Sequence, residues 1–362
     1  MPIALFDPAT PVRAIEARVR AAVDAVLADG SYVLGPHVEG FERAFAHYVG
    51  AGHVIGVANG TEAITIALRA LGVGPGDDVV VPSFTFYASA EAIPPTGARP
   101  VFCDIDPETF VVTPQAVRAA LTPATKAVVA VHLFGNVAPV SEIEALGVPV
   151  VEDAAQAAGS RAAGGARTGA LGTLATFSFY PSKNLGAFGD GGAIATSDAA
   201  LAETVRTLRL HGSRDGLTYE LVGYNSRLDA LQAAILHAQL PELDRWCEAR
   251  RVAGRRYAQR LEGVVGLPRP TAGSDPAWGL YVVRDREPDA LGAVLAAEGI
   301  GARGYYRTPV HRQPALAGLA PPAELPGTEE AARTHLAIPM APTLSDERVD
   351  MVIEAVSEAT GG

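Results

Sequence analysis

The sequence predicts an α/β protein with a large, mostly parallel sheet that is covered by helices on both faces. From about His53 onward, short β-rich runs alternate with helical patterns, which is the order of βαβ units. Apolar residues make up 48% of the 362-residue chain, enough for a substantial core. Polar or aromatic residues follow several strands, at the sheet edge where parallel sheets bind ligands.

The N-terminal region predicts two helices ahead of the sheet. Thr10 is expected as an N-cap with Pro11 in the first turn, and Gly30 ends the apolar helical pattern that follows. Phe41 and Phe45 belong to the second helix. Strands are then expected over residues 53–57, 78–82, 100–103, 127–132, 148–152, 173–179 and 193–196. Helices are expected over residues 61–71, 87–93, 114–121 and 199–210.

The C-terminal part predicts a second, smaller unit. A helical region begins at Arg227 and is interrupted near Pro241. The later expected segments are a linker at 263–276, a strand at 279–283, a helix at 289–298, a Pro-rich loop at 309–326 and a helix at 346–359. We therefore predict a large domain over residues 1–240, with an N-terminal helix expected against the small domain, and an α+β domain over residues 241–362.

Composition excludes several classes of protein. The net charge of −11 and the pI near 5.2 disfavour a nucleic-acid binder, which needs a basic face. Two cysteines, Cys103 and Cys247, imply neither a disulfide framework nor a cysteine-rich zinc site, as expected in a reducing cytoplasm. The N-terminus lacks a signal-peptide pattern, and no apolar stretch predicts a membrane span.

One segment, residues 172–192, carries an unusual lysine. A β-branched and aromatic run is broken at Pro181 and leads to Lys183, which is followed by a glycine-rich loop. A desolvated lysine loses proton affinity and can form a Schiff base, so Lys183 is a candidate reactive amine. The alternative interpretation is an exposed loop lysine beside ordinary turn glycines.

Other strand ends carry groups that could bind a ligand. Gly60 and Thr61 open a helix directly after a strand, where free backbone N–H groups form a phosphate cradle, although a simple helix cap has the same pattern. Phe86 could stack on a planar ring or belong to the core. Glu152 and Asp153 end a buried strand, where two carboxylates require partners.

Two further strand ends have mainly structural interpretations. Asp104 and Asp106 resemble the Asp-x-Asp metal pair of nucleotide-sugar glycosyltransferases, but Asp106-Pro107-Glu108-Thr109 is also an ordinary turn sequence, which we favour. His132 is interpreted as a hydrogen-bonded core histidine, and no metal site is predicted.

Pyridoxal phosphate accounts for these strand ends together. This cofactor requires a lysine for its aldehyde, an anion cradle for its phosphate and a carboxylate for its ring nitrogen. It also benefits from an aromatic side chain against its ring. The sequence supplies these groups as Lys183, Gly60 with Thr61, Asp153 and Phe86, while Ser178 could donate to the phosphate and Gln156 to the phenolic oxygen of the ring.

Nearly the whole chain resembles the DegT/StrS-type nucleotide-sugar aminotransferases, which are pyridoxal phosphate enzymes of fold type I. The matching motifs are Asn59-Gly60-Thr61-Glu62-Ala63, Val151-Glu152-Asp153-Ala154-Ala155-Gln156, Ser178-Phe179-Tyr180-Pro181-Ser182-Lys183-Asn184, Gly189-Asp190-Gly191-Gly192, His211-Gly212, Gly223-Tyr224-Asn225-Ser226-Arg227-Leu228-Asp229 and Tyr306-x-x-Pro309-x-His311.

The resemblance implies a role for each matching residue. Lys183 would bind the aldehyde of the cofactor and Asp153 its pyridinium nitrogen, while Phe86 and Gln156 would contact the ring. The phosphate would be bound by Gly60, Thr61, Ser178 and, from the neighbouring subunit of a homodimer with shared active sites, Asn225. Substrate contacts would come from Tyr180, Tyr306 and His311.

Two positions depart from the family pattern. Gly279 stands where many relatives have histidine, and Arg307 follows Tyr306 where many have proline. Both departures could alter the sugar pocket. Arg307 could be an additional anion contact or merely exposed.

The resemblance implies transamination of a nucleotide-linked keto sugar with L-glutamate as the amino donor. The segment from Asn225 to Asp229, followed by Gln232, is more similar to relatives that act at C-3 than at C-4, which favours a dTDP-3-keto-6-deoxyhexose. The alternatives are a C-4 aminotransferase, a non-catalytic regulator that binds the cofactor, a sugar dehydratase (which would replace Lys183 by histidine) and the metal-dependent glycosyltransferase.

Overall fold

A seven-stranded sheet forms the centre of the molecule. The computed structural model describes residues 2–321 and 323–361, so Pro322 of the predicted Pro-rich loop lies outside the described residues. The strand order is β1-β7-β6-β5-β4-β2-β3. The bounds are β1 His53–Val57, β2 Asp78–Pro82, β3 Arg99–Cys103, β4 Thr125–Val131, β5 Val150–Asp153, β6 Leu174–Ser178 and β7 Gly192–Thr196. Only β7 runs antiparallel to its neighbours, so the predicted mostly parallel sheet is confirmed.

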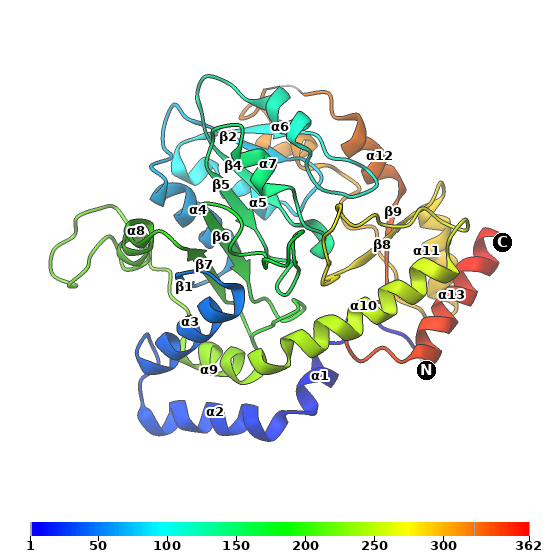
Figure 1. Cartoon of the computed structure of the whole chain (residues 1–362), viewed down its shortest axis with the longest axis horizontal. Helices are drawn as coiled ribbons and strands as arrows, with labels where there is room; N and C mark the ends of the chain where they lie inside the picture. The colour runs from blue at the N-terminus through cyan, green and yellow to red at the C-terminus, as the bar shows by residue number, and fades with distance from the viewer. Residues whose placement is uncertain (1, 322, 362) are drawn as a thin grey trace.

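Helices cover both faces of this sheet (Figure 1). Alternate strand residues point to opposite faces. Accordingly, Val54 of β1 packs in one apolar cluster with Phe41 and Phe45, while Ile55 packs in another with Ile64. The helices up to β8 are α1 Ala9–Arg13, α2 Glu16–Asp29, α3 Pro36–Val49, α4 Gly60–Ala70, α5 Ala88–Glu91, α6 Pro114–Ala120, α7 Val140–Glu144, α8 Ala199–Arg209, α9 Ala230–Gln239 and α10 Leu243–Arg260.

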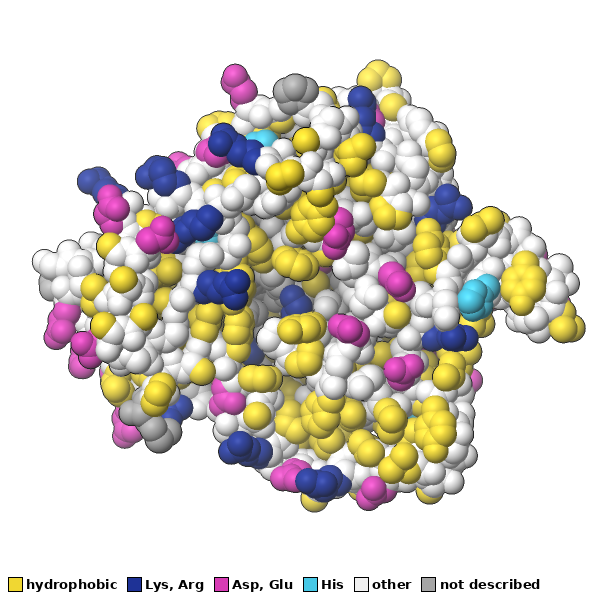
Figure 2. Space-filling view, turned by 180° about the vertical axis from the view of Figure 1, so that it is seen from behind, with side chains coloured by type: hydrophobic (Ala, Val, Ile, Leu, Met, Phe, Trp, Pro, Cys, Tyr) yellow, Lys and Arg dark blue, Asp and Glu magenta, His cyan; other side chains and the backbone are white. Residues whose placement is uncertain are grey.

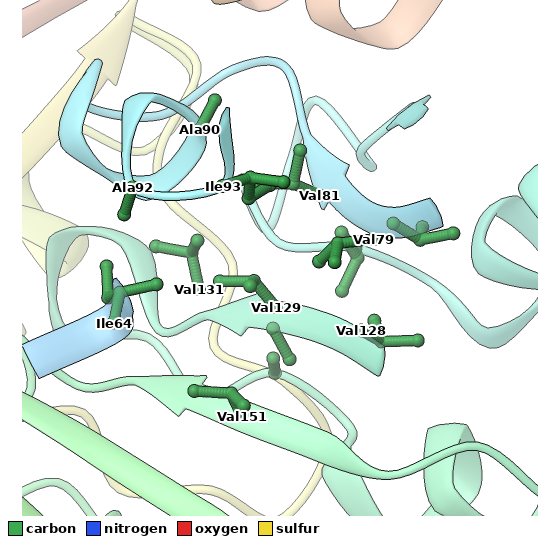
Figure 3. Close-up of a cluster of buried hydrophobic side chains, with 14 of the residues drawn as sticks. Ile64, Val79, Val81, Ala90, Ala92, Ile93, Val128, Val129, Val131 and Val151 are labelled. Atoms are coloured by element: carbon green, nitrogen blue, oxygen red, sulfur yellow. The ribbon is translucent and has the colours of Figure 1, made fainter. Parts of the chain in front are cut away.

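The inner parallel strands form a core of β-branched side chains. Four fully buried valines lie close together beside the neighbouring helices (Figure 3): Val79, Val81, Val129 and Val151. Burying one such side chain stabilises a fold by about 1.5–3 kcal/mol. The core therefore fixes the positions at which β2, β4 and β5 end, and with them the polar residues that follow.

A second, two-stranded sheet is built from the C-terminal part of the chain. Its strands, β8 Tyr281–Arg284 and β9 His335–Ile338, are antiparallel. Ile3 joins this part through hydrogen bonds with Gly299 and Gly301. The helices here are α11 Pro288–Ala297, α12 Pro326–Thr334 and α13 Asp346–Thr360. The domain boundary at residue 240 stays a prediction. Among the described residues, no helix is long and apolar enough to cross a bilayer.

The N-terminal helices differ from the prediction. Thr10 is not an N-cap: it lies inside α1, and its N–H donates to Asp7 Oδ1 at 3.0 Å. The pattern that ends at Gly30 is split between α1 and α2, and α2 packs against α9. Arg18 of α2 also pairs with Glu242 at 2.9 Å, and packing of this helix on the small domain stays a prediction. Gly30 does end α2, with the positive φ of 68° that glycine adopts readily.

Candidate active site

A cavity of about 840 Å³ lies at the carboxyl ends of the parallel strands. Residues at or just after the ends of β1, β2, β5 and β6 line it, together with Gly279, Leu280, Arg303, Tyr305 and Tyr306. Figure 2 shows a hollow near the middle of one face, with Lys or Arg atoms inside it. The predicted site residues that line the cavity are Gly60, Thr61, Phe86, Asp153, Gln156, Ser178, Tyr180, Lys183 and Tyr306.

Lys183 reaches the cavity from the loop that follows β6. Its backbone N–H donates to the carbonyl oxygen of Tyr180 at 2.9 Å, which tightens the turn around Pro181. Burial lowers the pKa of the Lys183 amine, although the negative charge of Asp153 opposes this shift. The amine is thus biased toward its neutral, nucleophilic form, as a Schiff-base lysine requires.

Asp153 ends β5 and is only 6% exposed. Its Oδ2 accepts a hydrogen bond from Ser89 Oγ at 2.7 Å, and its Oδ1 accepts one from the Ala155 N–H at 3.2 Å. Ser89 in turn lies 3.0 Å from Thr85 Oγ1. These contacts keep a buried carboxylate hydrogen-bonded and oriented at the cavity. Sequence reasoning missed Ser89, because nothing in its own segment marks it as the partner of a carboxylate 64 positions away.

The start of α4 offers the predicted anion cradle. Asn59 caps the helix by accepting the Glu62 N–H at 2.9 Å, while the N–H groups of Gly60 and Thr61 have no acceptor within the helix. Ser178 lies against Gly60 so closely that a Cβ at Gly60 would be 2.7 Å from the Ser178 Cβ. Glycine is therefore required for the helix start and the end of β6 to meet, which places both predicted phosphate donors together.

The aromatic and amide residues divide between the mouth and the wall of the cavity. Phe86 is 57% exposed and Tyr180 is 56% exposed, so both rings are accessible to a ligand. Gln156 is held in the wall, where its Oε1 accepts the Phe134 N–H at 2.7 Å and its Nε2 donates to the Tyr306 hydroxyl at 3.1 Å. The Gln156 amide and the Tyr306 hydroxyl therefore act as one unit.

Two predicted site residues lie away from this lining. His311 Nδ1 is 2.6 Å from Ser83 Oγ and its Nε2 is 3.3 Å from Glu329 Oε1, so the ring ties two segments of the chain together. Asn225 is exposed, and its Oδ1 accepts a hydrogen bond from Arg227. Contact of either residue with a substrate or with a partner's cofactor stays a prediction.

The two departures from the family pattern have structural explanations. A Cβ at Gly279 would lie 2.5 Å from the backbone oxygen of Gln156, so a side chain there requires the backbone to move. The Arg307 guanidinium donates to the His335 carbonyl at 2.6 Å and to Asp289 Oδ1 at 2.8 Å. Arg307 therefore stabilises the C-terminal end of α12 and is neither a free anion contact nor merely exposed.

The remaining strand-end polar residues are structural. Asp104 accepts the N–H groups of Gly327 and Thr328 at the start of α12, and Asp106 accepts the N–H groups that close its own turn. In the described chain, no group of three or more acidic, histidine or cysteine residues is arranged to hold a metal ion. His132 is buried and contacts Glu152 at 2.8 Å, so its interpretation as a core histidine is confirmed.

Fold and site together define a class of enzyme. The cavity combines a lysine biased toward its neutral form, a buried and oriented carboxylate, free helix N–H groups and an exposed aromatic ring. These residues fit pyridoxal phosphate. Comparison with known proteins agrees: the structure of NtdA from Bacillus subtilis, with pyridoxamine phosphate bound, matches with a TM-score of 0.88 at 29% identity over 96% of this chain and 82% of that chain.

The chain belongs to the DegT/DnrJ/EryC1/StrS aminotransferase family, whose model matches residues 13–357. It is 45% identical over 95% of its length to the dTDP-3-amino-3,4,6-trideoxy-α-D-glucose transaminase of Streptomyces venezuelae, of which it covers 92%. It is 43% identical over 99% of its length to the pleiotropic regulatory protein of Geobacillus stearothermophilus, of which it covers 98%. The structure of DesV from S. venezuelae matches with a TM-score of 0.96 at 43% identity, over 100% of this chain and 99% of that chain. The protein is therefore an aminotransferase that uses pyridoxal phosphate.

Proposed function

We propose that this aminotransferase transfers an amino group from L-glutamate to C-3 of a nucleotide-linked keto sugar, a dTDP-3-keto-6-deoxyhexose. The observation that carries the proposal is the reaction for which its relatives are named. Besides the S. venezuelae transaminase, these include a dTDP-3-amino-3,6-dideoxy-α-D-galactopyranose transaminase of Aneurinibacillus thermoaerophilus at 40% identity. A third is a UDP-N-acetyl-3-dehydro-α-D-glucosamine 3-aminotransferase of Acidithiobacillus ferrooxidans at 41% identity. Their common feature is the position of the amine, not the nucleotide.

Different residues of the cavity would bind different groups of the cofactor. Pyridoxal phosphate, when bound, supplies an aldehyde that carries the amino group and a ring that withdraws electrons from the reacting carbon. Lys183 would bind the aldehyde, and the N–H groups of Gly60 and Thr61 with the Ser178 hydroxyl would bind the phosphate. Asp153 would hold a proton on the ring nitrogen, because an ionised carboxylate stabilises a neighbouring cation.

Proton transfer is assigned to Lys183. Lys183 Nζ, when it does not hold the cofactor, would be a neutral base that could take up the α-proton of the amino donor and hold it for return to the site of amino transfer. The keto acid then leaves and the keto sugar enters the same cavity, where Lys183 moves the proton in the opposite direction. Ser89 contributes indirectly, since its hydrogen bond orients Asp153. Because both substrates use one cavity in turn, ping-pong kinetics are expected.

The regiochemistry can be tested directly. Purified enzyme is incubated with L-glutamate and either a dTDP-3-keto or a dTDP-4-keto 6-deoxyhexose, and amino-sugar formation is followed by mass spectrometry. We expect turnover of the 3-keto sugar. Turnover of only the 4-keto sugar would reject the C-3 proposal in favour of the C-4 alternative. Absence of turnover with either sugar, in a protein that binds the cofactor, would favour the regulatory alternative suggested by the name of the Geobacillus relative.

A further inference from the structure

Arg303 presents a positive charge at the cavity from the C-terminal part of the chain. It lines the cavity beside Tyr305, and its side chain is exposed. The Arg303 N–H donates to the Ala337 carbonyl at 3.0 Å, and the Ala337 N–H donates back to the Arg303 carbonyl at 2.9 Å. This pairing with β9 fixes the backbone of Arg303, so the side chain projects from a rigid base.

The Arg303 guanidinium lies over an aromatic ring. Its Cζ is 4.9 Å from the ring centroid of Tyr305, within the range of a cation–π contact. Such a contact orients the guanidinium and leaves its N–H groups available to a ligand. In the described chain Arg303 makes no salt bridge, whereas Arg307, four residues later, is paired with Asp289. The two arginines therefore have different roles: one holds the fold and the other faces the cavity.

The charged residues that line the cavity indicate a role for Arg303 in binding a substrate. Its described lining carries three acidic residues, Glu62, Asp153 and Asp190, and two basic ones, Lys183 and Arg303. Lys183 is committed to the cofactor under the proposed function, which leaves Arg303 as the basic residue available to a substrate. An anionic substrate entering among carboxylates requires an opposite charge, because each nearby like charge disfavours binding.

We propose that Arg303 is the residue of this chain that binds the anionic group of the substrate. The planar guanidinium matches two oxygens of a carboxylate or a phosphate, which a single ammonium does not. This inference rests on the proposed function, which supplies two sources of such a group: the carboxylates of the amino donor and the diphosphate of the nucleotide sugar. Both are retained while the amino group is transferred, so Arg303 acts in binding and orientation and moves no proton.

The test measures binding without turnover. Holoenzyme is titrated by calorimetry with free dTDP and, separately, with glutarate, which has the carboxylates of the donor but no amine to react. The variants are Arg303→Gln and Arg303→Lys. Arg286→Gln is the matched control, since Arg286 is also exposed but does not line the cavity. We expect Arg303→Gln to raise the Kd of one probe by about 10- to 100-fold, the range for a lost charged hydrogen-bonding group, and Arg286→Gln to leave it unchanged.

Each outcome decides the inference. Weakened dTDP binding assigns Arg303 to the diphosphate, weakened glutarate binding assigns it to the donor carboxylate, and unchanged binding of both probes overturns the proposal. If Arg303→Gln does not fold, Arg303→Lys decides by the same comparison, since lysine keeps the charge but not the planar fork. Failure of the proposed function is seen separately, as a wild-type protein that turns over neither keto sugar.

Discussion

At the scale of single residues, the chemistry depends on how Lys183 is surrounded. The chain has only two lysines, and the other, Lys126, is exposed at the start of β4. Burial pushes the Lys183 amine toward neutrality, while Asp153 is held in place by Ser89 and the Ala155 N–H. A neutral amine and an oriented carboxylate are complementary requirements of the same cofactor, and neighbouring strand ends supply them.

Lys183→Ala is expected to abolish covalent cofactor binding. The visible absorption band of the wild-type protein should disappear, and kcat should fall by about 10²–10⁴-fold or more, because the proton-transfer group is lost. Lys126→Ala is the control and should keep both. Borohydride reduction followed by peptide mass spectrometry should find the cofactor on Lys183. Label on Lys126, or a wild-type protein that binds no pyridoxal phosphate, would contradict the assignment.

Glycines near the site allow segments of the backbone to approach one another closely. A Cβ at Gly186 would lie 2.5 Å from the Pro181 carbonyl oxygen, and one at Gly192 would collide with the backbone of Asn59. These glycines let the Lys183 loop and the start of α4 pack closely. Their first role is therefore to shape the backbone of the site.

At the scale of elements, α12 and β9 form the support of Tyr306. Asp104 caps the start of α12, and Arg307 binds carbonyl groups at its end. His335, the first residue of β9, is buried and accepts the Tyr306 N–H on Nε2 at 3.0 Å, while its Nδ1 lies 2.8 Å from the Ala331 carbonyl oxygen. This network positions the Tyr306 hydroxyl on Gln156.

His335 should make the protein sensitive to acid. Burial lowers its pKa from 6.5 to about 4, so the unfolded state takes up a proton before the folded state does. Stability is therefore lost as the pH falls from about 6.5 to about 4, by about 3 kcal/mol at most. The measurement is urea unfolding of the wild type and His335→Asn over this range. We expect the variant to be less stable at neutral pH and the difference to shrink as the pH falls. A difference that is constant with pH would refute this role.

At the scale of the whole molecule, an arm projects from the body after α8 (Figures 1 and 2). We define the arm as residues 211–226. It exposes large apolar side chains, with Leu217 84%, Tyr219 63% and Val222 85% exposed. Its base is closely packed, because a Cβ at Gly212 would overlap the Leu221 carbonyl oxygen. An apolar surface on a projecting segment is typical of a contact with another protein chain, in agreement with the predicted dimer.

Subunit complementation tests the shared site. If Asn225 serves the partner's cofactor, Lys183→Ala and Asn225→Ala should each impair both sites of their own homodimer. A heterodimer of the two has one site with both native residues. Random mixing after co-expression should therefore restore about a quarter of the wild-type activity, since half the dimers are mixed and each has one intact site. Mixed Lys183→Ala and Asp153→Ala subunits are the control and should regain nothing if both residues serve their own subunit. No recovery with Asn225→Ala would exclude the shared site.

Features that depend on local sequence patterns were predicted better than features that depend on contacts between distant segments. The strands and their order along the chain were predictable because β-branched runs are local patterns, and β9 was missed because its short run forms a strand only against β8. Nine of the eleven predicted site residues line one cavity, since each directly follows or adjoins a predicted strand end or belongs to a family motif. Ser89 was missed because its partner Asp153 lies 64 positions away, and Arg303 was missed because its place at the cavity depends on backbone pairing with β9.

The class of chemistry follows from the order of residues along the chain. The lysine, the carboxylate and the helix start occupy strand ends, and a parallel sheet brings strand ends to a common edge whatever the details of packing. Which charged side chains are available to a ligand depends on how the chain folds. Arg303 and Arg307 are chemically identical and four positions apart, yet one is tied to Asp289 and backbone carbonyls and the other lies over Tyr305 at the cavity. Arg307 is held by Asp289 and His335, and Arg303 reaches the cavity because its backbone pairs with Ala337 of β9, so no local pattern distinguishes the arginine that holds the fold from the one we assign to the substrate.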